Sequence, residues 1–341
     1  MKTKQKNRIK KNIKKTKKRK INGGNPNKND QLQILLKSKS DTNIKNVRCS
    51  PKKKGIKNNF SCYTDESLYK LRNLWNSRHP DATINTNDTK EIHSKLQQFL
   101  GGVCNKESCW LKQQFAQGKI SNDIVESFAP ESPKEWKKNP NDWLSSLEII
   151  KVMKQYEKAY DCFEFIGPSP IDFDKKKLYG ECVWEELCHF SLAKQIENGK
   201  TKIGIIFNTD PHDKPGQHWM SMFINIPKRS IFFFDSVGDK APKEIMKLVK
   251  RIKKEGLKLQ KINSNKYNDN DNNNDNKDMK FTFDQNYPIE HQYGNTECGI
   301  YSLFFIVHLL EDKLTEEYFK THILKDEYME KFRKVYFNDS L

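Results

Sequence analysis

The stretch IGIIFNTDPHDKPGQHWMSMFINIPKRSIFFFDS, residues 203–236, decides the fold. It holds three runs rich in β-branched and aromatic residues, at 203–208, 220–226 and 231–236, and turn residues separate them. Runs of this kind predict β-strands. The short turn Pro-Lys-Arg-Ser at 227–230 predicts that the last two strands form a hairpin.

Helical patterns lie on both sides of these strands. Apolar residues recur at helical spacing within 65–130, and further helices are predicted at 142–160, near 182–196 and at 243–255. In the segment 142–160, Leu144, Leu147, Ile150 and Met153 are expected to lie on one face of the helix.

The segment GIYSLFFIVHLLEDKL, residues 299–314, is apolar enough to be a buried helix, and a final helix fits 315–333. Strands in the middle with helices before and after predict an α+β or α/β core. Of the two, we expect α+β, with a mixed sheet packed on helices.

The charge pattern divides the chain into regions. Residues 1–57 hold 21 of the 62 Lys and Arg but 2 of the 44 Asp and Glu, so the remainder is close to neutral. We expect a disordered basic tail at 1–60, a helical accessory region at 61–130 and a main domain at 131–341. The Asn/Asp-rich stretch 262–280 is expected to be a disordered insert within that domain.

The basic tail predicts a partner of opposite charge. A flexible polycation binds polyanions by counterion release, so nucleic acid is the expected partner. A nuclear-import signal and a solubilising extension stay open as alternatives. No apolar segment of signal-peptide type follows the charges, and no run of 18 apolar residues occurs, so no membrane contact is expected.

Eight cysteines are scattered along the chain, at 49, 62, 104, 109, 162, 182, 188 and 298. Without a signal peptide, free thiols in a reducing intracellular compartment are expected. The spacings of Cys104 with Cys109, and of Cys182, Cys188 and His189, do not match zinc patterns, so neither a metal nor a cofactor is expected.

Cys298 is the candidate nucleophile. It stands in QYGNTECGIYSLFF, where a turn enters the apolar helix, and the partial positive charge of a helix N-terminus favours a thiolate. Gly299 after it would let a substrate backbone approach closely. Taken alone, a cysteine in this position is more often a small buried apolar residue.

His218 and Asp235 are the candidate base and its orienting carboxylate. His218 begins one predicted strand and Asp235 ends the next. With the predicted turn, residue 222 pairs with 235, which leaves the two side chains about four residues apart. A bulge, a strong twist or a shifted register has to close that gap. A structural histidine and a turn-initiating aspartate are the alternative interpretations.

Gln292 is the fourth candidate, six residues before Cys298. Its side-chain amide can donate to an oxyanion together with the Cys298 backbone N–H. Considered on its own, this glutamine would not stand out.

Together these motifs resemble a known family. HW at 218–219, FFFDS at 232–236 and Q-x5-C-G at 292–299 resemble the signature of the SUMO protease and adenovirus endopeptidase superfamily. The likeness is strongest to the polyprotein-processing thiol proteases of large DNA viruses, of African swine fever virus and giant-virus type. It covers about residues 135–310.

The resemblance implies a papain-like, adenain-like core with the nucleophile at the N-terminus of a buried helix. It implies the roles of nucleophile for Cys298, base for His218, orienting group for Asp235 and oxyanion donor for Gln292.

The family also clamps a Gly-Gly stretch of substrate in a narrow aromatic channel. Trp219 and Trp143 correspond to its walls. Ser146 stands where the family usually has an acidic residue after Trp-Leu-x, which departs from the pattern around Trp143.

The function implied is a cysteine endopeptidase that processes viral structural or polyprotein precursors at Gly-Gly-like sites, in the virion and the cytoplasmic viral factory. A deSUMOylating or deubiquitinating isopeptidase is the alternative with the same site. A nucleic-acid-binding protein with an inactive protease fold and an acyltransferase are two further alternatives.

Overall fold

The computed structural model describes residues 43–44, 47–53, 60–117, 122–266 and 280–339. Most of the predicted basic tail and residues 267–279 of the predicted insert lie outside these ranges. Within the described part of the chain, no helix has the length and apolar character needed to cross a membrane.

The centre of the fold is a five-stranded mixed sheet of order β3-β4-β5-β6-β7. Strands β4, β5 and β6 are antiparallel neighbours, and each outer strand pairs in parallel with its neighbour. The strands are Phe163–Ser169 (β3), Lys202–Asn208 (β4), Trp219–Asn225 (β5), Ser230–Phe234 (β6) and Thr282–Gln285 (β7).

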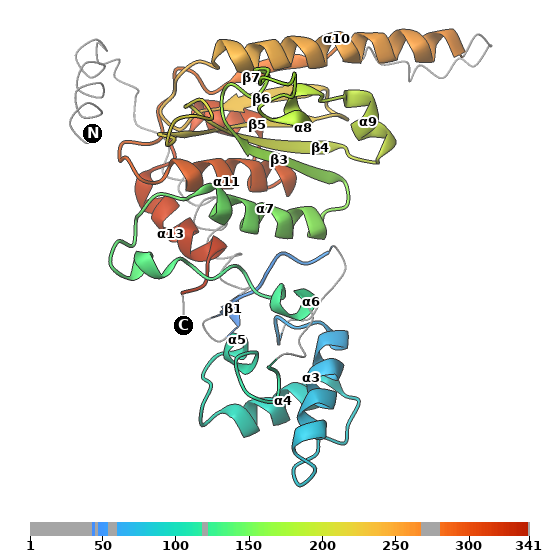
Figure 1. The fold of residues 1–341 in the computed structure, drawn as a ribbon, viewed down its shortest axis with the longest axis vertical. Helices are drawn as coiled ribbons and strands as arrows, with labels where there is room; N and C mark the ends of the chain where they lie inside the picture. Colours follow the sequence, from blue (N-terminus) through green and yellow to red (C-terminus); the bar gives the residue numbers. More distant parts are fainter. Residues whose placement is uncertain (1–42, 45–46, 54–59, 118–121, 267–279, 340–341) are drawn as a thin grey trace. The chain divides into compact units, whose positions relative to one another are not determined.

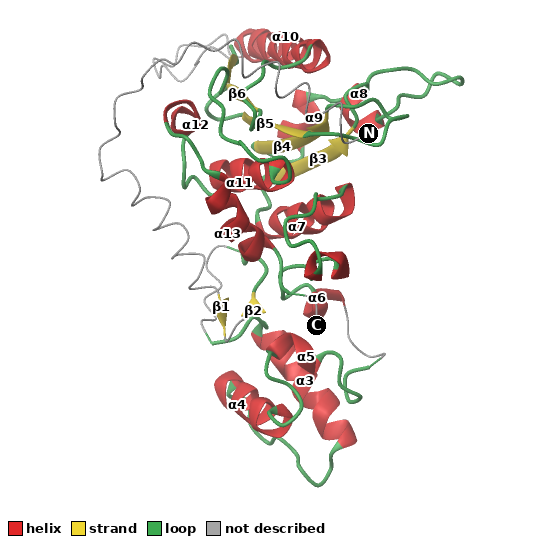
Figure 2. Cartoon of the chain, turned by 90° about the vertical axis from the view of Figure 1, so that its left-hand side faces the viewer, coloured by secondary structure: helices red, strands yellow, loops and turns green. Residues whose placement is uncertain are grey.

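Helices cover both faces of the sheet (Figures 1 and 2). On one side lies the long helix α10, Lys243–Lys266; on the other lie α7, Ser146–Ala159, and α11, Cys298–Leu310. The connecting helices are α8 (Glu185–Cys188) and α9 (Leu192–Glu197), and the chain continues after α11 with α12 (Glu316–Thr321) and α13 (Asp326–Tyr336).

Alternation along each strand explains the two covered faces. Ile203, Ile205 and Phe233 join the core beneath α10, together with Ile245 and Leu248 of that helix. Their neighbours in sequence point to the opposite face.

On that opposite face the sheet packs against α11. Phe234 stacks on Phe305, and the Phe232 ring packs against Phe305 at a tilt of 33°. A Cβ on Gly204 would lie 2.7 Å from a methyl carbon of Ile306. Both faces are therefore dry, and the predicted α+β fold is confirmed.

The accessory helices have an apolar core of their own. It contains Leu68, Leu71, Ile92, Leu96 and Trp110, all buried. The helices are α3 (Asp65–Arg78), α4 (Thr89–Leu100), α5 (Glu107–Trp110) and α6 (Asn122–Val125).

The predicted tail boundary at residue 60 is too late. Asn43–Ile44 (β1) pairs with Val47–Arg48 (β2), and residues 47–53 lie among the described ranges. The Arg48 backbone N–H donates to Asn338 at 2.7 Å, and Lys53 pairs with Asp161 at 2.9 Å. Long-range contacts, which no local pattern reveals, thus hold residues 47–53 in place.

Other predicted boundaries also change. The predicted insert 262–280 begins too early, because α10 runs to Lys266; β7 begins at Thr282, after its predicted end. The predicted helix 315–333 is two helices, α12 and α13, and the first ends at Thr321. A short 3-10 helix, η2, spans Lys134–Lys137 before the core.

Six of the eight cysteines are paired, which corrects the expectation of free thiols. The bonds are Cys49–Cys62, Cys104–Cys109 and Cys182–Cys188, and the free residues are Cys162 and Cys298. The two cysteines of a bond are 13, 5 and 6 residues apart in sequence, respectively, so each bond links nearby parts of the chain. The predicted reducing compartment stays a prediction.

Candidate active site

Cys298 is the first residue of α11, as the sequence predicts. Every residue of this helix is buried, and Cys298 itself is 2% exposed with a free thiol. The N–H groups of a first helical turn have no acceptor within the helix, so they present partial positive charge at the sulfur. The helix therefore offers N–H donors beside the sulfur.

His218 and Asp235 are in direct contact. The imidazole Nε2 and the carboxylate Oδ1 are 2.7 Å apart, and the carboxylate is almost fully buried. Since Nε2 is engaged by Asp235, Nδ1 is the ring nitrogen left for another partner.

The predicted register between β5 and β6 is wrong by two residues. Met222 pairs with Phe233 and Asn225 with Ser230, so the loop comprises residues 226–229. Arg229 adopts a left-handed conformation with φ of 53° and its N–H donates to the Ile226 carbonyl. The shift halves the expected gap, and Asp235 lies just beyond the end of β6, where it reaches His218.

The charges around His218 raise its pKa to about 10 from an ordinary value of 6.5. Burial alone lowers the pKa, but the Asp235 charge and hydrogen bond outweigh it, and a hydrogen bond and charge from Cys298 raise it further. The imidazole thus lies between the carboxylate and the thiol sulfur. An imidazolium in this place stabilises a thiolate.

His291, by contrast, is held neutral. It is fully buried, and burial lowers its pKa to about 4. Its ring nitrogens lie 3.0 Å from the Phe319 carbonyl and 3.2 Å from the Leu324 N–H, both backbone groups. This histidine therefore has a structural role.

Asn286, which was not among the predicted site residues, anchors Asp235. The Asn286 side chain accepts from the Asp235 N–H at 2.9 Å and donates to the Asp235 carbonyl at 2.7 Å. Val237 N–H adds a 3.1 Å bond to the same carboxylate oxygen that faces His218. A single asparagine after β7 carries no motif, so only the parallel pairing of β6 with β7 brings it there.

Gln292 is buried beside the segment that follows Asp235. Its side-chain oxygen accepts from the Ser236 hydroxyl at 2.7 Å, and its backbone N–H donates to the Ser236 carbonyl. The side-chain nitrogen donates to the Gly294 carbonyl at 3.2 Å. An amide nitrogen carries two hydrogens, so one N–H is left for a further acceptor.

Trp219 and Gly299 pack against the segment that contains Trp143. The Trp219 indole N–H donates to the Leu144 carbonyl at 2.9 Å. A Cβ on Gly299 would lie 2.9 Å from the Leu144 Cβ and 3.3 Å from a Trp219 ring carbon. Close packing by itself therefore requires glycine at 299. Trp143 is half-buried and precedes α7, whereas the sequence predicted it within the helix.

An ion pair at the start of the nucleophile helix was also missed. Glu297, the N-cap of α11, lies next to Cys298 and is 3% exposed. Its carboxylate receives three hydrogen bonds from the Arg333 guanidinium, at 2.9 to 3.1 Å. The two residues are 36 positions apart, and no local spacing links them.

One group of possible metal ligands occurs among the described residues. The ligand atoms of Cys182, Cys188 and His189 lie within 4.8 Å of one another. The two sulfurs are joined in a disulfide, however, and a disulfide sulfur offers no thiolate to a metal.

Comparisons with known proteins agree with this geometry. A protein of Acanthamoeba polyphaga mimivirus that is named a thiol protease is 25% identical over 282 residues, 77% of this chain and 84% of its own. A cysteine protease of African swine fever virus is 27% identical over 265 residues, 70% of this chain and 88% of its own. The crystal structure of an African swine fever virus protease shares the fold, with a TM-score of 0.54 and 20% identity over 86% of this chain and 98% of that one.

The class that the fold and the site define is the cysteine proteases. Residues 193–340 match the Ulp1 protease family, C-terminal catalytic domain. This part of the chain is thus similar to the Ulp1-family catalytic domain, and the two relatives described above are viral proteases.

Proposed function

We propose that this protein cleaves peptide bonds through Cys298, His218 and Asp235, with Gln292 as an oxyanion donor. The observation that carries the proposal is the position of His218, whose imidazole is hydrogen-bonded to Asp235 and interacts with the Cys298 thiol. The thiolate attacks the scissile carbonyl, and the imidazolium gives its proton to the leaving amine. The neutral imidazole then takes a proton from water, which hydrolyses the thioester.

The oxyanion of the tetrahedral intermediate needs donors. The backbone N–H of Cys298 lies at the helix terminus, and the second side-chain N–H of Gln292 is the proposed partner donor. Replacing Gln292 by Ala should lower kcat about 100-fold or more while KM changes little, because the donor acts on charge that develops only in the transition state.

We propose that the substrate is a viral precursor protein with a Gly-Gly-like site. The viral identity of the relatives and the close packing of Trp219, Leu144 and Gly299 support this choice. Side chains packed this tightly leave little room for a Cβ on a substrate residue beside them. Trp143 and Trp219 are the proposed walls of the channel that binds these glycines. The proposed locations of the protein are the virion and the viral factory.

A peptide series tests this specificity. Peptides that differ only in Gly-Gly, Gly-Ala, Ala-Gly or Ala-Ala before the scissile bond are compared by kcat/KM. Each alanine should lower kcat/KM by about 100-fold. Equal rates for all four peptides would show that no narrow channel selects glycine.

A deSUMOylating or deubiquitinating activity is the second candidate, and the match to the Ulp1 family favours it. Purified protein offered a Gly-Gly-containing virion precursor and a SUMO or ubiquitin conjugate separates the two. Cleavage of the precursor alone supports the first candidate, and cleavage of the conjugate alone supports the second.

We also propose that the basic N-terminal segment binds nucleic acid. Residues 1–37 hold 14 Lys and Arg and one acidic residue. Tethering to packaged nucleic acid would raise the protease concentration near its substrates. Deleting residues 1–37 keeps Cys49 and the described strands, and it should abolish salt-sensitive DNA binding. Unchanged binding would rule the role out.

A further inference from the structure

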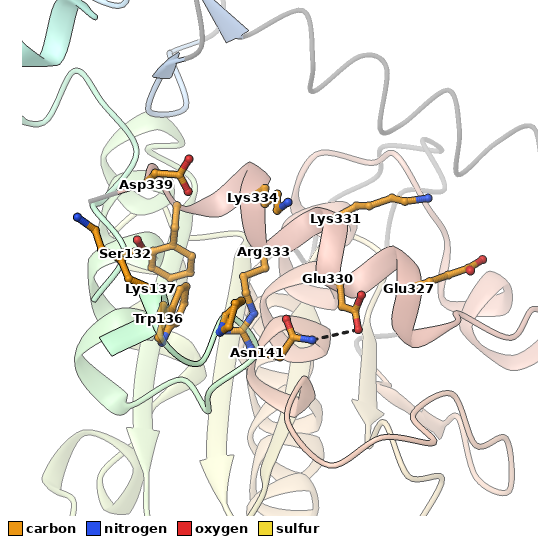
Figure 3. Close-up of a pocket in the computed structure, with 12 residues that line it drawn as sticks. Ser132, Trp136, Lys137, Asn141, Glu327, Glu330, Lys331, Arg333, Lys334 and Asp339 are labelled. Carbon is orange, nitrogen blue, oxygen red and sulfur yellow. Dashed lines mark hydrogen bonds between the residues drawn. The ribbon is translucent and has the colours of Figure 1, made fainter. Parts of the chain in front are cut away.

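A pocket of about 600 Å³ lies beside α13 (Figure 3). Its walls come from α13, from the chain after it and from segment 132–141, which includes η2. Trp136 and Phe337 form an aromatic wall, with ring centroids 5.1 Å apart in an edge-to-face arrangement.

Arg333 lines this pocket and leaves one donor group unused. Its side chain is 5% exposed, and its Nε and Nη2 donate to Glu297. Among the described residues Nη1 has no hydrogen-bond partner. The guanidinium carbon lies 4.3 Å from the centroid of the Trp136 ring, which holds the group in place. A buried, fixed donor without an acceptor is uncommon in proteins and needs an explanation, and a bound acceptor group supplies one.

The charges around the pocket indicate which ligand fits. Lys137, Lys331 and Lys334 are exposed on its rim. Three carboxylates also line it, those of Glu327, Glu330 and Asp339, and Glu330 accepts a hydrogen bond from Asn141 at 3.2 Å. This mixture is unsuited to a polyanion and suits a single acceptor group beside an apolar wall.

We propose that this pocket binds an acidic side chain of a peptide, whose carboxylate accepts from Nη1 of Arg333. The methylene groups of an aspartate or glutamate would pack on Trp136 and Phe337, and Lys137 and Lys331 would complement the charge. Arg333 also holds Glu297, the residue before Cys298. A peptide carboxylate bound to Arg333 would therefore lie next to the ion pair at the start of α11. The connection of the pocket to the nucleophile rests on the proposed function, whereas binding of the peptide does not.

Calorimetric titration of the full chain with Cys298→Ala tests the site without cleavage. The probes are acetyl-Ala-Gly-Glu-Gly-Ala-amide and its Gln counterpart. We expect the Glu peptide to bind and the Gln peptide to bind at least about tenfold more weakly, since charge-assisted hydrogen bonds are the stronger ones. Equal affinity of the two peptides, or no binding of either, overturns the proposal.

Three variants in the Cys298→Ala background locate the binding. Glu297→Gln removes the negative charge that neutralises the Arg333 guanidinium, so it should tighten binding of the Glu peptide. The double change Lys137→Glu and Lys331→Glu should weaken it by about tenfold, because the rim then repels the ligand. The double change Lys250→Glu and Lys254→Glu, at exposed positions of α10, reverses the same number of charges; it is the matched control and should change nothing. An equal effect of the control and the rim variant, or no tightening by Glu297→Gln, contradicts the site.

A last experiment identifies whether the acidic residue belongs to the substrate or to another protein. If the acidic residue belongs to the substrate, cleavable peptides with Glu at one of several distances from the Gly-Gly pair should show a lower KM than the Gln versions. If it belongs to another protein, the free Glu peptide changes the rate without changing which substrates are preferred. Binding to the Cys298→Ala variant without cleavage by the native protein would refute the proposed function alone, and cleavage without binding would refute this inference alone.

Discussion

The contact between Asp235 and His218 shows what a sequence reveals about single residues. Both were predicted from residue type, position at strand ends and resemblance to a protease family. Their contact was not predictable, because it depends on a two-residue register shift and on Arg229 in a left-handed conformation. Asn286 and Arg333 were missed entirely, since their partners lie 51 and 36 residues away.

Asp235→Asn should move the alkaline limit of activity to lower pH. The Asp235 charge raises the pKa of His218 to about 10, so its loss lowers that pKa, and the imidazolium that protonates the leaving amine is lost earlier as pH rises. We also expect kcat/KM at neutral pH to fall about 100-fold or more, since the imidazole loses its orienting partner. Profiles of kcat/KM against pH for the two proteins measure both effects; an alkaline limb at the same pH would contradict this electrostatic role.

The same pair sets a pH dependence of stability. Because the folded-state pKa of His218 is raised, its contribution is fully present below about pH 6.5 and disappears as pH rises through about 10. Denaturant unfolding of the native protein and of His218→Ala at pH 6 and pH 10 tests this sign. The difference between the two proteins in free energy of unfolding should shrink at pH 10, and a difference that grows would contradict the assignment.

At the scale of elements, α7 shows why periodicity located a helix but not its buried face. The predicted helix 142–160 placed Leu144, Leu147, Ile150 and Met153 on one face. The helix begins at Ser146, behind a capping box formed by Ser145 and Glu148. Leu144 therefore lies outside the helix, and the apolar positions that share its buried face have to be counted from Ser146. Leu147 is 64% exposed as a result, and Ile149 is fully buried.

Two alanine variants test the orientation of α7. Ile149→Ala should lower the free energy of unfolding by about 2–5 kcal/mol, because it leaves a cavity in the core. Leu147→Ala should change it by about 0.5 kcal/mol or less, since the side chain is mostly in solvent. Denaturant titration measures both, and a larger effect at 147 than at 149 would mean that the helix is rotated.

At the scale of the whole molecule, the sequence predicted the layered fold and the helical region before it, since both depend on patterns of apolar residues. It failed on features set by tertiary contacts. Residues 47–53 carry a basic composition but are held by Asn338 and Asp161, and the six paired cysteines follow from where the loops bring them.

The cysteine pairing gives a prediction for the intact chain. Protein that is unfolded without reductant should contain two titratable thiols, those of Cys162 and Cys298, because the other six are bonded. Thiol titration followed by peptide mapping checks the number and the positions. Eight reactive thiols before any reduction would contradict the pairing.

The central claim is that Cys298 is an activated nucleophile. The most direct measurement is labelling of the native chain by an electrophilic Gly-Gly peptide probe, with the modified residue mapped by mass spectrometry. We predict stoichiometric modification of Cys298, loss of labelling in His218→Ala, and no modification of Cys162, the other free and more exposed thiol. Labelling of Cys162 in preference to Cys298, or undiminished labelling of Cys298 without His218, would contradict the account.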